Sequence, residues 1–191
     1  MKRFLFLTLF TFISSFTFGQ TNEGPNEITP LILQKIKADI EKEIPAFKQK
    51  MSKEMNTDKI EFSLDTFRIE RICAKRMDID YSTAGINTSV DMLTAAYDQL
   101  MNKYYNKLLK LLKPEDKMVL VTAQKAWLVY RDAEAKLIGT MTKEEYSGGG
   151  TIQSNIATGS YSSLVVKRAI DVFNYYDDVS KDGLHQSKKL H

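Results

Sequence analysis

One apolar stripe, between residues 86 and 111, constrains the fold of this chain more than any other feature. Its aliphatic and aromatic side chains recur at spacings of four or three, at Ile86, Val90, Leu93, Tyr97, Leu100, Tyr104, Leu108 and Leu111. That spacing places them all on one face of a helix, which is roughly 40 Å long at about 1.5 Å per residue. Because so long an apolar face must be covered by other elements, the stripe predicts a helical bundle.

Helical spacing also occurs on both sides of this stripe. The patterns predict long helices near residues 66–79, 84–112, 115–140 and 152–178, with a kinked helix near 31–55 packed outside them. Asp65 and Ser82 stand where side chains cap helix N-termini, and Pro114 follows a short connection that predicts antiparallel neighbours. Apolar residues on one side of the 115–140 helix are expected to face the core: Leu120, Ala123, Trp127, Tyr130, Ala133 and Leu137.

Two places in the N-terminal half interrupt the helical pattern. Pro45 removes a backbone hydrogen bond inside the first helix, which is therefore expected to kink or split near Glu43. Residues 60–64 alternate apolar and polar side chains, but no other segment resembles a strand that could pair with them, so they are expected to form an extended linker. The fold class predicted for the whole chain is all-α, a small bundle of long antiparallel helices with an additional N-terminal helical region.

The first nineteen residues are typical of an export signal. Lys2 and Arg3 form a basic start, residues 4–18 are mostly apolar, and small residues precede Gln20. We expect cleavage before Gln20 and a periplasmic or extracellular protein with no stable membrane anchor. A lipid-anchored lipoprotein is excluded on this interpretation because no cysteine lies near the cut. The polar residues 180–191 are expected to form a flexible tail.

Charge and cysteine content narrow the classes of function. The signal carries two of the 27 basic residues and none of the 24 acidic ones, so the remaining chain has a formal charge of 25 − 24 = +1. A nucleic-acid partner is therefore not expected, since such partners favour strongly basic surfaces. Cys73 is the single cysteine and cannot form an internal disulfide. Its position on an apolar helix face is typical of a core thiol, which favours a structural role over a nucleophile.

The side chains that catalysis commonly uses are scarce. Both histidines, His185 and His191, lie in the tail, so neither a histidine-based triad nor a zinc site is expected. The glycines at 148–150 lack the lysine and the preceding strand of a phosphate-binding loop, which favours a flexible reversal of the chain. The sequence therefore predicts a protein that is not an enzyme and that has no cofactor or metal.

Two stretches carry polar and aromatic residues that a plain bundle does not need. One runs Tyr81-Ser-Thr-Ala-Gly-Ile-Asn87 and continues at Asp98-Gln-Leu-Met-Asn102-Lys-Tyr-Tyr105. The other runs Ala123-Gln-Lys-Ala-Trp127-Leu-Val-Tyr-Arg131-Asp-Ala-Glu134, followed by Gly148-Gly-Gly-Thr-Ile152 and Arg168. Together they resemble the LprI-like lysozyme-inhibitor N-terminal domain family, in which the matching positions are Thr83, Asn87, Asp98, Asn102, Tyr105, Gln124, Trp127, Arg131, Asp132, Gly149, Gly150 and Arg168.

The resemblance implies a domain at residues 81–179, a helical extension at 20–80, and lysozyme or another envelope protein as the partner. Family members usually carry four half-cystines, and their places here fall near Tyr81 and at Ser89, Ala135 and Ser160, none of which is a cysteine. The expected function is that of an exported, non-catalytic binding protein of the cell envelope. Two alternatives stay open: an envelope interaction module without action on lysozyme, and an enzyme of undetected type.

Spacing alone favours a structural role for most of these motif residues. Arg131 and Arg168 are expected to pair with Asp98 or Asp132 and so fix how the helices align. Trp127 is expected to lie in the core and to donate its indole N–H to a polar neighbour.

Overall fold

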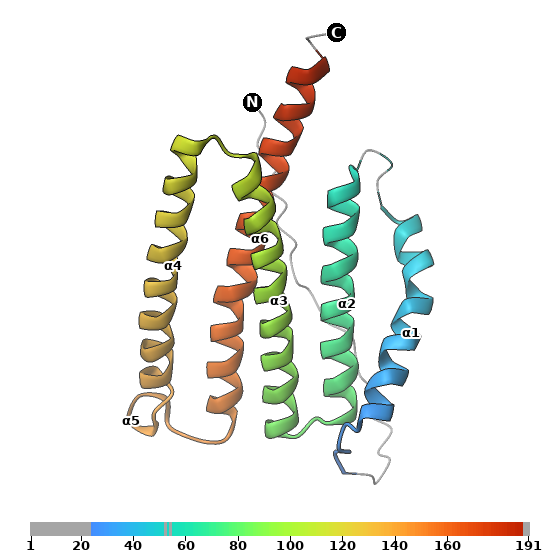
Figure 1. The fold of residues 1–191 in the computed structure, drawn as a ribbon. Coiled ribbons are helices and arrows are strands. Elements are labelled where there is room, and N and C mark those ends of the chain that lie inside the picture. Colours follow the sequence, from blue (N-terminus) through green and yellow to red (C-terminus); the bar gives the residue numbers. More distant parts are fainter. Residues whose placement is uncertain (1–23, 52, 54, 189–191) are drawn as a thin grey trace.

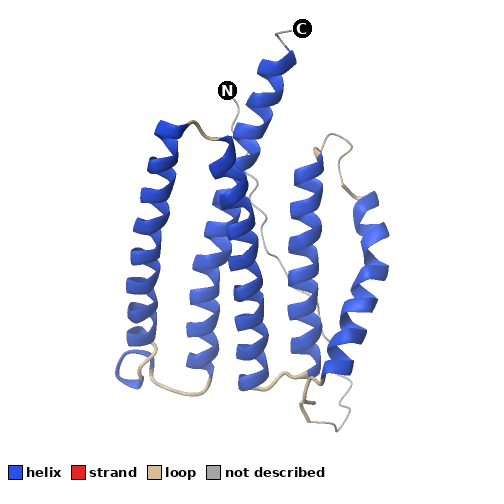
Figure 2. Cartoon of the chain, in the orientation of Figure 1, coloured by secondary structure: helices blue, strands red, loops and turns tan. Residues whose placement is uncertain are grey.

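The computed structural model describes residues 24–188 except 52 and 54, with side chains up to residue 180. Its helices are α1 (Pro30–Gln49), α2 (Thr57–Ile79), α3 (Thr83–Leu111), α4 (Pro114–Met141), α5 (Glu144–Ser147) and α6 (Ile152–Lys188). Successive long helices run in opposite directions, with α1 and α4 at the two edges of the bundle (Figure 1). Every regular element of the described residues is a helix, as Figure 2 shows, so the all-α prediction is confirmed.

Helices α3 and α6 form the centre of the bundle and make its most extensive contact. They run in the same direction, because α4 and α5 carry the chain back to the end from which α3 starts (Figure 1). The predicted stripe supplies Tyr97, Leu100, Tyr104 and Leu108 to the core, while Leu111 at its end is 48% exposed. Side chains of α6 cover the stripe with Val165, Ala169, Val172, Phe173 and Tyr176.

Aromatic rings join α2 to this central pair. Phe62 of α2 stacks on Phe173 of α6 with ring centroids 3.8 Å apart, and Tyr104 of α3 meets both rings edge-on, at 5.4 Å and 4.9 Å. The prediction of an extended linker at residues 60–64 is therefore wrong. Asn56 caps the helix by accepting a hydrogen bond from the Lys59 N–H at 2.8 Å, so α2 begins at Thr57 and not after Asp65.

Helix α1 packs on α2 at the edge of the bundle. Thr29 caps its start, and the helix continues through Pro45 to Gln49, so the proline does not split it and the helix ends before the predicted residue 55. Ile36, Ile40 and Ile44 are buried against α2. The opposite end of the chain differs as well, since α6 extends to Lys188 beyond its predicted end near residue 178.

Helix α4 lies at the other edge and packs mainly on α6, although a short connection joins it to α3. Among its apolar residues, the buried Leu120 and the half-buried Trp127 contact the central core. The prediction that Ala123, Tyr130, Ala133 and Leu137 face the core is wrong, since all four are exposed. Spacing shows that residues share a face but not which of two faces a neighbour covers.

The export signal falls in residues 1–23, which are outside the described residues. No helix in the part of the chain that the structure describes is both long enough and apolar enough to cross a membrane.

Candidate functional site

A groove of about 370 Å³ runs between α3 and α4. We call it the α3–α4 groove, and its lining residues are Asp98, Met101, Asn102 and Tyr105 from α3 and Val121, Gln124, Lys125, Leu128 and Arg131 from α4. Five of them belong to the motif positions recognised in the sequence: Asp98, Asn102, Tyr105, Gln124 and Arg131. Two motif stretches that lie apart in sequence therefore meet at one surface feature.

Gln124 connects the three helices around the groove. Its side-chain oxygen accepts two hydrogen bonds from Arg168 of α6, from Nε at 3.0 Å and from a terminal guanidinium nitrogen at 2.9 Å. Its amide group donates to the sulfur of Met101 on α3, at 3.7 Å. Because both ends of this amide are held, Gln124 fixes α4 relative to α3 and α6 by polar contacts rather than by deep apolar burial.

The α3 wall of the groove is a row of polar side chains. Asp98, Asn102 and Tyr105 follow one another at spacings of four and three, so they lie along one helix face beside the core stripe. The Asn102 amide donates a hydrogen bond to the Asp98 carboxylate at 3.1 Å. This bond lies within α3, so it orients the two side chains and leaves further hydrogen-bonding atoms available to a ligand.

Trp127 lies beside the groove between two arginines. The guanidinium carbons of Arg131 and Arg168 are 5.6 Å and 5.8 Å from the centre of its ring, which is a distance for cation–π attraction. The indole is half-buried and packs on the edge of the core. No hydrogen bond of its N–H is found among the described residues, so the expected polar acceptor for this group is not observed.

Arg131 pairs with one of its two predicted partners, Asp132, whereas Arg168 pairs with neither. Arg131 donates to the Asp132 carboxylate at 2.9 Å and 2.6 Å, and this hydrogen bond raises the pKa of the Arg131 guanidinium above its usual value. Asp132 is the next residue of the same helix and its side chain is 63% exposed, so the pair does not fix the alignment of two helices. Arg168 bonds Gln124 and not one of the two predicted carboxylates.

The remaining four motif residues lie away from the groove, near the connections at one end of the bundle. Thr83 opens α3 directly after its cap Ser82, and the Asn87 side chain donates to the hydroxyl of Ser154 on α6. Gly149 and Gly150 follow α5 with φ angles of 80° and 90°, which are unfavourable for residues with a side chain. Their positions indicate that they shape the turn into α6.

Sequence analysis missed four of the groove residues: Met101, Val121, Lys125 and Leu128. Met101, Val121 and Leu128 each stand three or four positions from a motif residue, so helical spacing alone could have located them. Arg76 and Ser89 were missed as well, and they line a second pocket described below. An arginine within the apolar stripe of α2 was the only signal for that pocket.

The groove presents hydrogen-bonding groups and no reactive nucleophile. It contains one carboxylate, two amides, a phenol and two cations beside apolar side chains. Cys73 lies outside it, 5% exposed, and burial raises the pKa of its thiol. Among the described residues, no cluster of histidine, cysteine, aspartate or glutamate side chains could hold a metal ion.

These features define a small all-α protein with a groove at one edge that is lined largely by polar side chains. A comparison with known families matches residues 73–171 to the family described as "Lysozyme inhibitor LprI". Because the match spans just over half of the chain, the protein belongs to the LprI lysozyme-inhibitor family, and the predicted resemblance is confirmed. No match was found among curated proteins or among solved structures.

Proposed function

We propose that this protein is an exported, non-catalytic binding protein of the cell envelope, that its partner is lysozyme, and that the α3–α4 groove contacts the partner. The observation that carries the proposal is the convergence of five motif residues of a lysozyme-inhibitor family on one groove. Such a protein would act by covering the substrate cleft of lysozyme or its rim.

The outer side of α4 supports a protein as the partner. Next to the groove, this helix exposes the apolar side chains Met118, Val119, Val129, Tyr130, Leu137 and Met141, each at least half accessible to solvent. Several large apolar side chains exposed along one helix are typical of a surface that binds another protein. A small polar metabolite would gain nothing from them.

Charge sets the expected character of the interaction. Lysozymes are commonly basic, while this chain has a formal charge of +1 after removal of its predicted signal. Long-range attraction therefore contributes little, and binding depends on short-range hydrogen bonds and apolar contacts. We expect the association rate to change only slightly with ionic strength.

The decisive experiment is a titration of lysozyme activity with the purified protein. We expect loss of lysozyme activity at near-stoichiometric amounts, and an inhibition constant at least tenfold weaker for Arg131→Ala. Arg68→Ala is the matched control, because Arg68 also pairs with an exposed carboxylate, Glu41, at the opposite edge of the bundle. The control should inhibit within about twofold of the wild type, a change of about 0.4 kcal/mol.

Two outcomes contradict parts of this proposal separately. Full lysozyme activity in a large excess of wild-type protein would exclude lysozyme as the partner and favour an envelope module with another binding partner. Inhibition that survives Arg131→Ala and Asn102→Ala unchanged would place the contact surface outside the α3–α4 groove.

A further inference from the structure

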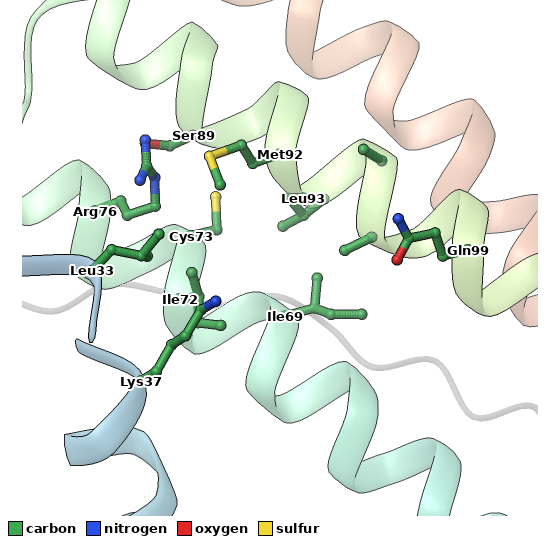
Figure 3. Close-up of a pocket in the computed structure, with 12 residues that line it drawn as sticks. Leu33, Lys37, Ile69, Ile72, Cys73, Arg76, Ser89, Met92, Leu93 and Gln99 are labelled. Atoms are coloured by element: carbon green, nitrogen blue, oxygen red, sulfur yellow. The ribbon is translucent and has the colours of Figure 1, made fainter. Parts of the chain in front are cut away.

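A second pocket, of about 420 Å³, lies between α1, α2 and α3, and Figure 3 shows it in close-up. Apolar side chains make most of its wall, among them Leu33, Ile69, Ile72 and Leu93. Its volume falls in the range of small-molecule sites, which are commonly apolar with a few polar groups at fixed positions. The lining residues include two cations, Lys37 and Arg76, and no carboxylate.

Arg76 is the unusual member of this lining. Only 7% of the residue is exposed, and its Nε is enclosed without a hydrogen-bond partner. By contrast, Arg68, Arg71 and Arg131 each pair with a carboxylate on more exposed surfaces. No described carboxylate pairs with the guanidinium of Arg76. A buried charge without a carboxylate partner is costly, and an anion bound at Arg76 would offset that cost.

A second polar atom without a partner lies in the same pocket. Ser89 of α3 is 1% exposed, and its hydroxyl makes no hydrogen bond with a described residue. Figure 3 places Ser89 and the guanidinium of Arg76 together at one end of the pocket, with Ile69 and Gln99 toward the other end. These two buried donors give the pocket a polar end, and Ile69, Ile72 and Leu93 give it an apolar body, while its other polar residues, Lys37 and Gln99, are exposed.

We propose that this pocket binds a single-chain anionic amphiphile, with its acidic head group held by Arg76 and Ser89 and its hydrocarbon tail against Ile69, Ile72 and Leu93. The guanidinium and the hydroxyl donate hydrogen bonds to the head group, and the charge of the head group compensates that of Arg76. Exposed residues at the rim, such as Met92 and Lys37, leave a path for the ligand to enter.

The length of the pocket favours a medium-length tail. Arg76 and Ile69 are seven residues apart on α2, which corresponds to about 10 Å at about 1.5 Å per residue. Octanoate has a carboxylate head group and a tail of comparable length. Three probes therefore separate the contributions of the charged head group and the hydrocarbon tail to binding. Octanoate has both a carboxylate and a tail, 1-octanol has the tail without the charge, and acetate has the charge without the tail.

Calorimetric titration of the full chain with these three probes tests the proposal. We expect octanoate to bind at least tenfold more tightly than 1-octanol or acetate, and tenfold corresponds to about 1.4 kcal/mol. Arg76→Met should reduce the affinity for octanoate to that for 1-octanol without changing the latter. Arg71→Met is the matched control on the same helix, since Arg71 lies outside the pocket and pairs with Glu43, and it should keep the preference for octanoate.

Thermal unfolding provides a second readout that separates a ligand site from a structural arginine. Without ligand, Arg76→Met should unfold at the same temperature as the wild type or higher, because the variant no longer buries an unpaired charge. A large fall in the unfolding temperature would show that the guanidinium stabilises the fold and would overturn the proposal. Ala96→Phe tests the same pocket with Arg76 in place: it fills the pocket, and it should abolish binding of octanoate and 1-octanol alike.

Equal affinity for octanoate and 1-octanol in the wild type would also overturn the proposal, as would octanoate binding that survives both substitutions. The result does not depend on lysozyme, because the α3–α4 groove shares no lining residue with this pocket.

Discussion

Helices α1 and α4 occupy opposite edges of the bundle, yet different kinds of contact attach them. α1 buries three isoleucines against α2 and adds two arginine–carboxylate pairs, Arg68 with Glu41 and Arg71 with Glu43. α4 buries only Leu120 among its own residues and relies on the bonds between Gln124 and Arg168. One edge is therefore held by apolar burial and the other largely by polar contacts.

This difference favours the α4 edge over the α1 edge as the binding surface that we propose. The family match covers α4 and excludes α1, and five of the twelve motif residues line the α3–α4 groove at this edge. Polar groups that are not enclosed by packing can exchange water for a ligand at little cost, whereas buried isoleucines cannot. The α4 edge is therefore the better candidate for binding, and the central helices supply the rigid support behind it.

The largest loss of stability is expected from a substitution in the centre of the bundle. Phe173→Ala removes a ring that is 4% exposed and packs on Phe62 and Tyr104, so it should lower the free energy of unfolding by about 3–5 kcal/mol. Urea denaturation monitored by circular dichroism measures this change. A loss below about 1 kcal/mol would mean that the central pair is not the main source of stability.

At the α4 edge, Trp127→Ala should have a smaller effect, of about 1–3 kcal/mol. The indole is only half-buried, so the substitution removes part of its apolar burial together with the contacts to Arg131 and Arg168. Tyr130→Ala on the exposed side of the same helix is the control, and it should stay within about 0.5 kcal/mol of the wild type. A loss for Trp127→Ala as large as that for Phe173→Ala would remove the contrast between edge and centre.

Acid should weaken the junction of α2 with the central pair. Burial alone would raise the pKa of the Asp58 carboxyl, but hydrogen bonds from Lys107 and Tyr176 together hold its pKa below the usual value. Because this pKa is lower in the folded state than in the unfolded state, the ionised carboxylate stabilises the fold above about pH 4. That stabilisation is lost as the pH falls through the pKa of the folded state. Asp58→Asn should therefore have a lower free energy of unfolding than the wild type at neutral pH. The difference between the two proteins should become smaller as the solution is acidified.

Unfolding free energies of both proteins, measured from about pH 7 to about pH 3, provide this comparison. If the difference in unfolding free energy between the two proteins stays constant over the whole range, the ionised form of Asp58 contributes nothing to stability.

The smallest change in stability is expected from a substitution of Asp132. Its ion pair with Arg131 lies on the surface, so Asp132→Ala should change the free energy of unfolding by no more than about 1 kcal/mol. A loss above about 2 kcal/mol, found by the same urea denaturation, would indicate a buried network in this region and would support the structural interpretation of the motif made from the sequence.

Local spacing predicted the long helices well where one apolar stripe dominates. α3 and α4 begin and end within a residue or so of their predicted bounds, because their period and the break at Pro114 are properties of the chain itself. The prediction failed at residues 60–64, because Phe62 packs against Tyr104 and Phe173, and local spacing does not reveal contacts with distant helices. The division into an extension at 20–80 and a domain at 81–179 stays a prediction, and the family match begins at residue 73, within α2.

The sequence by itself determined the all-α class, the order of the helices and the membership of the LprI family, because periodicity and motif spacing are local properties. Only the tertiary structure decided which apolar residues of α4 are covered, that Arg168 holds Gln124, and that Arg76 and Ser89 share one pocket. Each of these depends on how helices distant in sequence approach one another. The spacing of residues within each helix does not specify the distance between residues on different helices. That distance is set only when the helices pack together to bury the central apolar stripe.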